Sequence, residues 1–288
     1  MVQLGFLFGL VCMLTYGISK VLAKKALLLE NPYKVAVFIH FFISLTLLSF
    51  VAATGNFAVP NLSTIPLFLL TAIIGAIAIL SLYKGYAVGK ISLLSPIMSC
   101  ATIITVLLAV IFYKEFLTYL EVWGIIFAVV GMIFLSMRWS EWKKIAWQKI
   151  PGLKYALLTM LGWGFYFFLL KPIALEWGAL LTATYMETAI FLCLLGNALV
   201  KKQKFLEMKR SFFLTTLLGG FFVAIGSLFF NLGIMINRVS VLMVFAQASL
   251  FITVILSFIF LKERLEKNQA IGVFLIVIGL LMVSWNAM

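Results

Sequence analysis

Two ionisable side chains stand inside apolar stretches of this sequence. Glu187 lies well inside the run 179–200, and His40 lies 147 residues earlier, near the start of the run 34–54. An ionisable group is costly inside a membrane and is kept there mainly for function, and an imidazole titrates near neutral pH. The two residues are therefore predicted proton-coupling sites, with a structural contact between helices as the alternative.

Six further residues form pairs at nearly the same separation and could contact a small molecule. Gln247 gives the sharpest signal, because an unpaired amide inside lipid costs several kcal/mol. Aromatic rings can stack on a flat substrate or hold a cation. We expect these pairs to bind substrate in a central cavity, with hydrogen bonding between helices, helix capping or interfacial anchoring as the alternatives: Tyr16/Trp163, Tyr83/Asn231 and Ser99/Gln247.

The constant separation reflects an internal duplication. Residues 104–136 return as residues 252–284 at an offset of 148, and 13 of the 33 aligned positions are identical. Residues 5–24 match residues 152–171 at an offset of 147, with an aromatic residue before glycine and a lysine seven residues later. The duplication therefore includes the first apolar run of each half.

Composition defines the class of protein that contains these pairs. The chain is 65% hydrophobic and 11% charged, with a mean hydropathy of +1.19, which indicates an integral membrane protein. The net charge of +13 comes from basic residues between apolar runs, so it does not indicate nucleic-acid binding. Cys12, Cys100 and Cys193 lack the spacing of a metal site, and no nucleotide-binding or catalytic motif is found; no cofactor, metal or enzymatic activity is expected.

Ten runs are long enough to cross a bilayer, five in each half. An odd number of spans per half predicts an all-α membrane protein made of two inverted five-helix repeats, with a cavity between them. The predicted repeats are 1–138 and 152–288, joined by a basic loop at 139–151. The predicted spans are roughly 3–23, 34–54, 65–83, 91–113, 119–138, 152–171, 179–200, 211–232, 239–261 and 268–286.

Lysine and arginine predict the orientation. The connections after odd-numbered spans, with the span ends that flank them, contain 18 of these residues, and those after even-numbered spans contain 3. Because basic loops stay in the cytoplasm, both termini are predicted to lie outside it.

Residues near the span ends have more ordinary expected roles. Lys20, Lys24 and Lys171 are expected to reach lipid headgroups, or else to anchor an anionic substrate. Glu115 and Glu263 are expected to cap the fifth and tenth spans.

Glycine and proline predict packing and a break. Gly124 and Gly131, with their counterparts Gly272 and Gly279, predict a tight seam between helices or subunits. Pro96 is expected to bend or break the fourth span and expose backbone to the cavity; its counterpart lacks proline, so the break should be one-sided.

The chain resembles the EamA-type carriers of the drug/metabolite transporter superfamily. The resemblance rests on the duplicated Glu115…Gly124…Gly131 and Glu263…Gly272…Gly279 patterns and on the aromatic-glycine motif in the first and sixth spans. It implies a secondary carrier whose cavity is lined mainly by the first, third and fourth helices of each half. It also implies cytoplasmic termini, which the lysine and arginine count contradicts.

The expected function is secondary active transport of a small polar or amphipathic metabolite across the cell membrane, by alternating access. Export, with possible proton coupling, is the first expectation. The alternatives are an importer or exchanger of a small organic cation, favoured by the aromatic pairs and Glu187, and a non-transporting membrane scaffold or lipid-handling protein. The expected partners are the substrate and membrane lipid, and the expected state is a monomer or homodimer.

Overall fold

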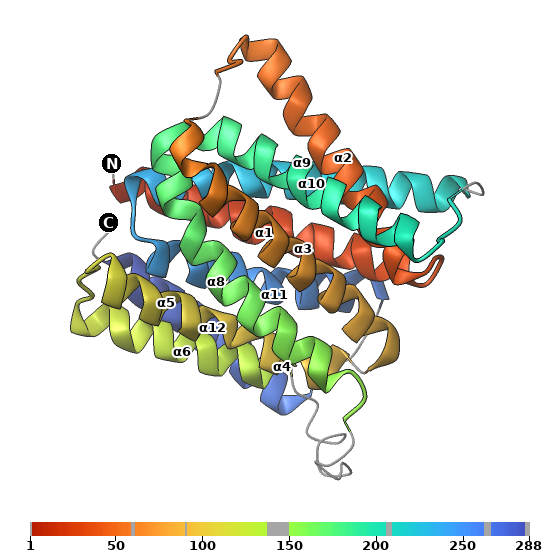
Figure 1. Cartoon of the computed structure of the whole chain (residues 1–288). Coiled ribbons are helices and arrows are strands. Elements are labelled where there is room, and N and C mark those ends of the chain that lie inside the picture. Colours follow the sequence, from red (N-terminus) through yellow and green to blue (C-terminus); the bar gives the residue numbers. More distant parts are fainter. Residues whose placement is uncertain are drawn as a thin grey trace.

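The computed structural model describes residues 2–58, 61–89, 91–136, 150–205, 209–261 and 266–285. Throughout these ranges the chain is helical or connects helices, and Figure 1 shows the helices gathered in one bundle. The helices are α1 Val2–Leu27, α2 Pro32–Thr54, η1 Leu62–Thr64, α3 Ile65–Val88, α4 Ile91–Ser99, α5 Ala101–Phe112, α6 Tyr119–Ser136, α8 Leu153–Trp177, α9 Ala179–Val200, α10 Arg210–Ile236, α11 Val239–Leu261 and α12 Lys267–Ser284.

The spans agree with the sequence prediction. Within the described ranges, ten helical segments are long and apolar enough to cross a membrane, which confirms the predicted number. The sixth span is longer than predicted, because α8 continues past Lys171 and Pro172 to Trp177. The predicted boundary near 138 and residues 139–149 of the predicted loop lie outside the described residues.

Local sequence signals set the ends of α2. The Asn31 side chain accepts hydrogen bonds from the backbone N–H groups of Tyr33 and Lys34, both at 3.1 Å, and Pro32 occupies the first turn. Gly55 ends the helix with φ 66°, a left-handed conformation that favours glycine. Asparagine and proline therefore start the second span, and glycine ends it.

The fourth span is interrupted, whereas its counterpart in the second half is continuous. Pro96 lies inside α4, which ends at Ser99, and α5 begins at Ala101. Its counterpart α11 runs unbroken from Val239 to Leu261. The expected one-sided break is present.

Each half packs its fourth span on the first span of the other half. The Thr105 hydroxyl of α5 donates to the Gly164 carbonyl of α8 at 3.0 Å, and the equivalent Thr253 hydroxyl of α11 donates to the Gly17 carbonyl of α1 at 3.1 Å. A Cβ on either glycine would collide with the isoleucine before the threonine. The duplicated glycine and threonine therefore form the same contact twice between the two halves.

The four spaced glycines form a seam between α6 and α12, which lie along the same edge of the bundle in Figure 1. Gly124 lies against the backbone of Gly279, and Gly131 lies against the backbone of Gly272. Without side chains the two helices approach until their backbones are in contact. The predicted seam is therefore present within a single chain.

This seam should not tolerate even one methyl group. A Cβ on Gly272 would lie 2.5 Å from the backbone N of Leu135 and 2.7 Å from the carbonyl oxygen of Gly131. We expect Gly272→Ala to lower the stability of the purified protein by about 1–3 kcal/mol, measured as a lower melting temperature. Gly196→Ala is the control, since a Cβ there meets nothing within 4 Å. Equal melting temperatures for the two variants would contradict this account of the seam.

Candidate functional site

A cavity of about 130 Å³ lies between the two halves of the chain. It is lined by α1, α2 and α3 from the first half and by α8, α9, α10 and α11 from the second. The second helices of the two halves therefore contribute, in addition to the helix positions that the family resemblance implies. On the first-half side, the broken fourth span is absent from the lining residues.

Most lining residues are related by the internal repeat. The matching residues are 147 apart on the first and second helices of each half and 148 apart on the third. The cavity is therefore built from equivalent positions of both copies. The pairs are Tyr16/Trp163, Ser19/Tyr166, Lys20/Phe167 and Ala23/Leu170 on α1 and α8; His40/Glu187 and Ile43/Ile190 on α2 and α9; and Gly75/Val223, Ile79/Ser227, Leu82/Phe230 and Tyr83/Asn231 on α3 and α10.

Seven of the eight residues singled out from the sequence lie on this cavity: Tyr16, His40, Tyr83, Trp163, Glu187, Asn231 and Gln247. Ser99 is buried at the end of α4, where its hydroxyl donates to the Ser95 carbonyl at 3.0 Å, and it is not one of the lining residues. The structure thus brings seven candidates together, and their role in binding or coupling stays a prediction.

Glu187 is held in place through one of its two carboxylate oxygens. The Ser227 hydroxyl of α10 donates to Glu187 Oε1 at 3.0 Å. His40 Nδ1 lies 3.1 Å from Glu187 Oε2, an ion pair when the imidazole is protonated. This second contact lacks hydrogen-bond geometry, and neither atom has a hydrogen-bond partner among the described residues. The carboxylate therefore has a fixed position but is only half satisfied.

Asn231 presents a second unsatisfied acceptor. Its Nδ2 donates to the Ser227 carbonyl at 2.8 Å, whereas its Oδ1 has no hydrogen-bond partner in the described part of the chain. The side chains of Glu187 and Asn231 are both buried. An unpaired buried acceptor costs about 1–3 kcal/mol, so two of them in one cavity indicate a place for a donor.

Aromatic rings form much of the remaining wall. They come from both halves, and the rings of Phe167 and Phe230 are 4.8 Å apart between centroids. Such walls suit a partly apolar molecule that is oriented by a few polar contacts. The aromatic lining residues are Tyr16, Tyr83, Tyr86, Trp163, Tyr166, Phe167 and Phe230.

Lys20 also lines the cavity, where it donates to Ser249 Oγ at 2.7 Å. The expectation that Lys20 reaches the headgroups was wrong, because Ser249 of α11 gives its ammonium a partner within the protein. Sequence reasoning also missed Ser227, Tyr166 and Phe167. Helical spacing would have found Tyr166 and Phe167, three and four residues after Trp163 on one face of α8.

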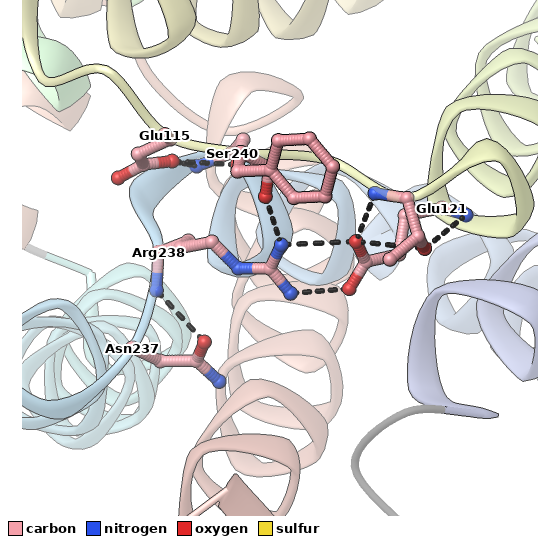
Figure 2. A network of polar contacts seen from close by, with 7 residues as sticks. Glu115, Glu121, Asn237, Arg238 and Ser240 are labelled. Carbon is pink, nitrogen blue, oxygen red and sulfur yellow. Dashed lines mark hydrogen bonds and ion pairs between the residues drawn. The ribbon is translucent and has the colours of Figure 1, made fainter.

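A second polar cluster joins the halves at one end of the bundle (Figure 2). Glu115, in the turn after α5, accepts the backbone N–H groups of Val239 and Ser240 at 2.9 and 3.1 Å, and the Ser240 hydroxyl at 2.6 Å. Lys171 of α8 donates to the same carboxylate at 2.9 Å. The expectation that Glu115 caps the fifth span was wrong: it caps the start of α11, where an anion complements the exposed N–H groups.

The fifth span is capped by Glu121 instead. Its Oε2 accepts the backbone N–H of Thr118 at 2.8 Å, and the Arg238 guanidinium binds both of its carboxylate oxygens. Arg238 also donates to the Phe116 carbonyl at 2.5 Å. Glu263, the counterpart of Glu115, lies outside the described residues. We call the cluster of Glu115, Glu121, Lys171, Arg238 and Ser240 the end network.

Membrane-length helices around a partly polar cavity between two halves suit a multi-pass membrane transporter. The model of the EamA-like transporter family matches residues 3–137 and 150–285. The chain belongs to this family, and is therefore a membrane transporter of the drug/metabolite type with a small-molecule substrate.

Two comparisons add detail. The uncharacterized protein MJ1333.1 of Methanocaldococcus jannaschii is 27% identical over 133 residues, which is 46% of this chain and 96% of that protein. A solved crystal structure superposes with a TM-score of 0.84 at 15% identity, covering 98% of this chain and 97% of the other. At that identity the likeness shows the fold alone.

The end network makes stability depend on pH. Burial by itself raises the pKa of Glu115, but the hydrogen bonds from Ser240 and the nearby Lys171 ammonium outweigh it, so its pKa lies below the ordinary 4.5. A depressed folded-state pKa gives stability that is present above pH 4.5 and is lost as the pH falls through the folded-state pKa.

We expect Glu115→Gln to lower the free energy of unfolding by about 1–3 kcal/mol at neutral pH, because Lys171 loses its charged partner. The difference in melting temperature from the wild type should shrink below pH 4.5. Lys114→Gln, which changes an exposed neighbouring charge, is the control. A difference that stays constant down to pH 3 would contradict the assigned role of Glu115.

Proposed function

We propose that this protein is a secondary active carrier that moves a small polar or amphipathic metabolite through the central cavity by alternating access. The observation that supports this most is the half-satisfied carboxylate of Glu187 inside a cavity built by both halves. A membrane scaffold or lipid-handling protein has no need for polar groups there, since buried polar atoms without partners only destabilise it.

Alternating access requires two halves that can separate at one end while they close at the other. The end network supplies contacts of this kind, because Glu115 and Glu121 belong to the first half and Lys171, Arg238 and Ser240 to the second. The network lies beside the start of α1, since a Cβ on Gly5 would contact Asn237, next to Arg238. In our proposal it closes the cavity toward the side on which the chain begins.

Glu187 and His40 are the proposed proton-coupling residues. Only one oxygen of the Glu187 carboxylate accepts a hydrogen bond within the described chain. The other oxygen can therefore gain or lose a proton, or accept a hydrogen bond from a substrate, without a large rearrangement of the protein. The other titratable residues that line the cavity are Tyr16, Lys20, Tyr83, Tyr86 and Tyr166, and none of these is acidic in the ordinary range. Glu187 is therefore the one carboxylic acid among the lining residues, and in our proposal it carries the coupled proton together with His40.

Direction and orientation are also part of the proposal. The excess of lysine and arginine in the connections after odd-numbered spans supports termini outside the cytoplasm. With this orientation the end network faces outward, and the cavity would load from the cytoplasm while the network is closed. We therefore propose export.

The test begins with a thermal-shift screen of amino acids, polyamines, choline-like cations, nucleosides and sugar phosphates. A ligand at 100 times its dissociation constant adds about 2.7 kcal/mol to the native state. The compound that binds is then followed in proteoliposomes with an imposed pH gradient. We expect the gradient to drive transport by the wild type, and Glu187→Gln, assayed at a compound concentration that saturates it, to transport the compound without responding to the gradient.

Glu176→Gln, at an exposed acidic residue outside the cavity lining, should respond like the wild type. Undiminished gradient-driven transport by Glu187→Gln would refute proton coupling through this residue. If no compound shifts the melting temperature of the wild type, the scaffold or lipid-handling alternative would replace the carrier proposal.

A further inference from the structure

The two unsatisfied acceptors in the cavity define the chemistry of the group that would bind there. We propose that the substrate carries a protonated amine, and that this amine donates to Glu187 Oε2 and Asn231 Oδ1. The inference rests on the proposed carrier function and names the class of its substrate.

Both atoms are acceptors without a hydrogen bond in the described part of the chain, and Glu187 Oε2 has only the His40 imidazole beside it, so the complementary group must be a donor. The Ser227 hydroxyl occupies Glu187 Oε1 at 3.0 Å and leaves Oε2 free of hydrogen bonds within the described chain. The Ser227 carbonyl accepts Asn231 Nδ2 at 2.8 Å, which fixes the amide with its Oδ1 away from that bond. Ser227 thus orients both acceptors at once.

The side chains that carry the two acceptors are both bonded to Ser227 on one turn of α10. Ser227 and Asn231 are four residues apart on α10, so their side chains lie on one face of the helix. Glu187 reaches that face from α9 through its bond to Ser227. Glu187 is 6% exposed and Asn231 is 1% exposed, so a bound amine would exchange water for two protein acceptors in a low-dielectric site.

The carboxylate of Glu187 is the only acidic group among the residues that line the cavity, so it favours a cation at this point over an anion or a neutral donor. The Lys20 ammonium on the same cavity has its own partner, Ser249. His40 Nδ1 lies 3.1 Å from Glu187 Oε2, so the amine would share this oxygen with the imidazole. Aromatic rings of Tyr16, Tyr166 and Phe230 line the same cavity and suit the apolar part of an amine and its charge.

Lys20 further limits the class of substrate. Its ammonium also lines the cavity, one helical turn from Tyr16, and is held by Ser249 at 2.7 Å. A second positive charge on the substrate would meet this ammonium, since both groups lie in the same small space. The proposal is therefore a compound with a single amine and an apolar or aromatic remainder.

The experiment uses four probes that share a phenyl ring: phenethylamine, its N,N,N-trimethyl derivative, phenethyl alcohol and 3-phenylpropionate. Each is titrated against the wild-type protein in detergent, with the melting temperature as the readout. We expect saturable stabilisation by phenethylamine and at least about tenfold weaker binding of the other three, which lack the N–H donors, the charge or both. Equal binding of the trimethyl derivative, or tighter binding of the propionate, would overturn the proposal.

The variants locate the site. Glu187→Gln and Asn231→Leu should each weaken phenethylamine by about tenfold or more. Thr184→Val, which alters a buried hydroxyl one turn away on α9 that bonds only within its own helix, should bind like the wild type. Because Asn231→Leu removes a buried amide and can impair folding, the isosteric Glu187→Gln provides the independent test. Wild-type affinity in a folded Glu187→Gln protein would overturn the assignment.

The outcomes separate this inference from the proposed function. If phenethylamine does not bind but another compound of the metabolite panel is bound and transported, the amine proposal fails and the carrier function stands. If the wild type neither binds nor transports any compound of either set, the carrier function itself fails.

Discussion

A bilayer offers no water to polar groups, so each polar atom inside this bundle must find its partner in the protein or in a bound molecule. Most do so locally: threonine and serine hydroxyls donate to carbonyl groups one turn back on their own helix, as Thr71 and Ser136 do. The informative groups are the few that reach farther. Most of them join the two halves or lie on the cavity between them.

Several contacts that join the halves occur twice, at positions related by the duplication. Thr105 and Thr253 bond the backbone of the first helix in the opposite half, and Gly131 and Gly272 bring α6 and α12 into backbone contact. Glu115 adds a charged contact at one end by capping α11 and pairing with Lys171. Neutral contacts of this kind hold the bundle together, whereas the ion pairs of the end network sit at an end, where water can replace a lost partner at lower cost.

Two polar groups on the cavity lack partners that most polar groups in the bundle have. Glu187 and Asn231 are buried, and each retains an acceptor without a hydrogen-bond partner in the described ranges. A protein tolerates this cost where function requires the group, and both acceptors lie between halves that the proposed mechanism moves apart. Other buried polar atoms without a partner in the described ranges, on Thr102, Trp177 and Thr188, do not line the cavity. Glu187 and Asn231 bring two unpaired acceptors to the cavity, which is why we propose that a substrate binds there.

Much of this could be predicted from the sequence because hydropathy and repetition are strong signals. The ten spans followed from apolar length, and the offset of 147 or 148 paired residues that the structure also brings to one cavity, such as Tyr16 with Trp163. The partner of Glu115 could not be predicted, because it lies 124 residues away across the interface between halves. At Ser99 the repeat gave a wrong expectation. Its counterpart Gln247 lines the cavity, whereas Ser99 lies in the interrupted fourth span, which contributes none of the described lining residues.

The central claim is that the halves move about this cavity and that the end network closes it on the side where the chain begins. It is tested most directly by a single cysteine at Ala246, a lining residue, in a protein whose Cys12, Cys100 and Cys193 are replaced by alanine. Sealed vesicles of known orientation are labelled with a membrane-impermeant maleimide, with and without Glu115→Gln and Arg238→Gln. When the network is broken, the cysteine at Ala246 should be labelled faster from the side of the membrane on which the chain begins. Labelling of a control cysteine at Leu192, an exposed position on α9, should not change. Equal labelling rates at Ala246 with the network intact and broken would contradict the central claim.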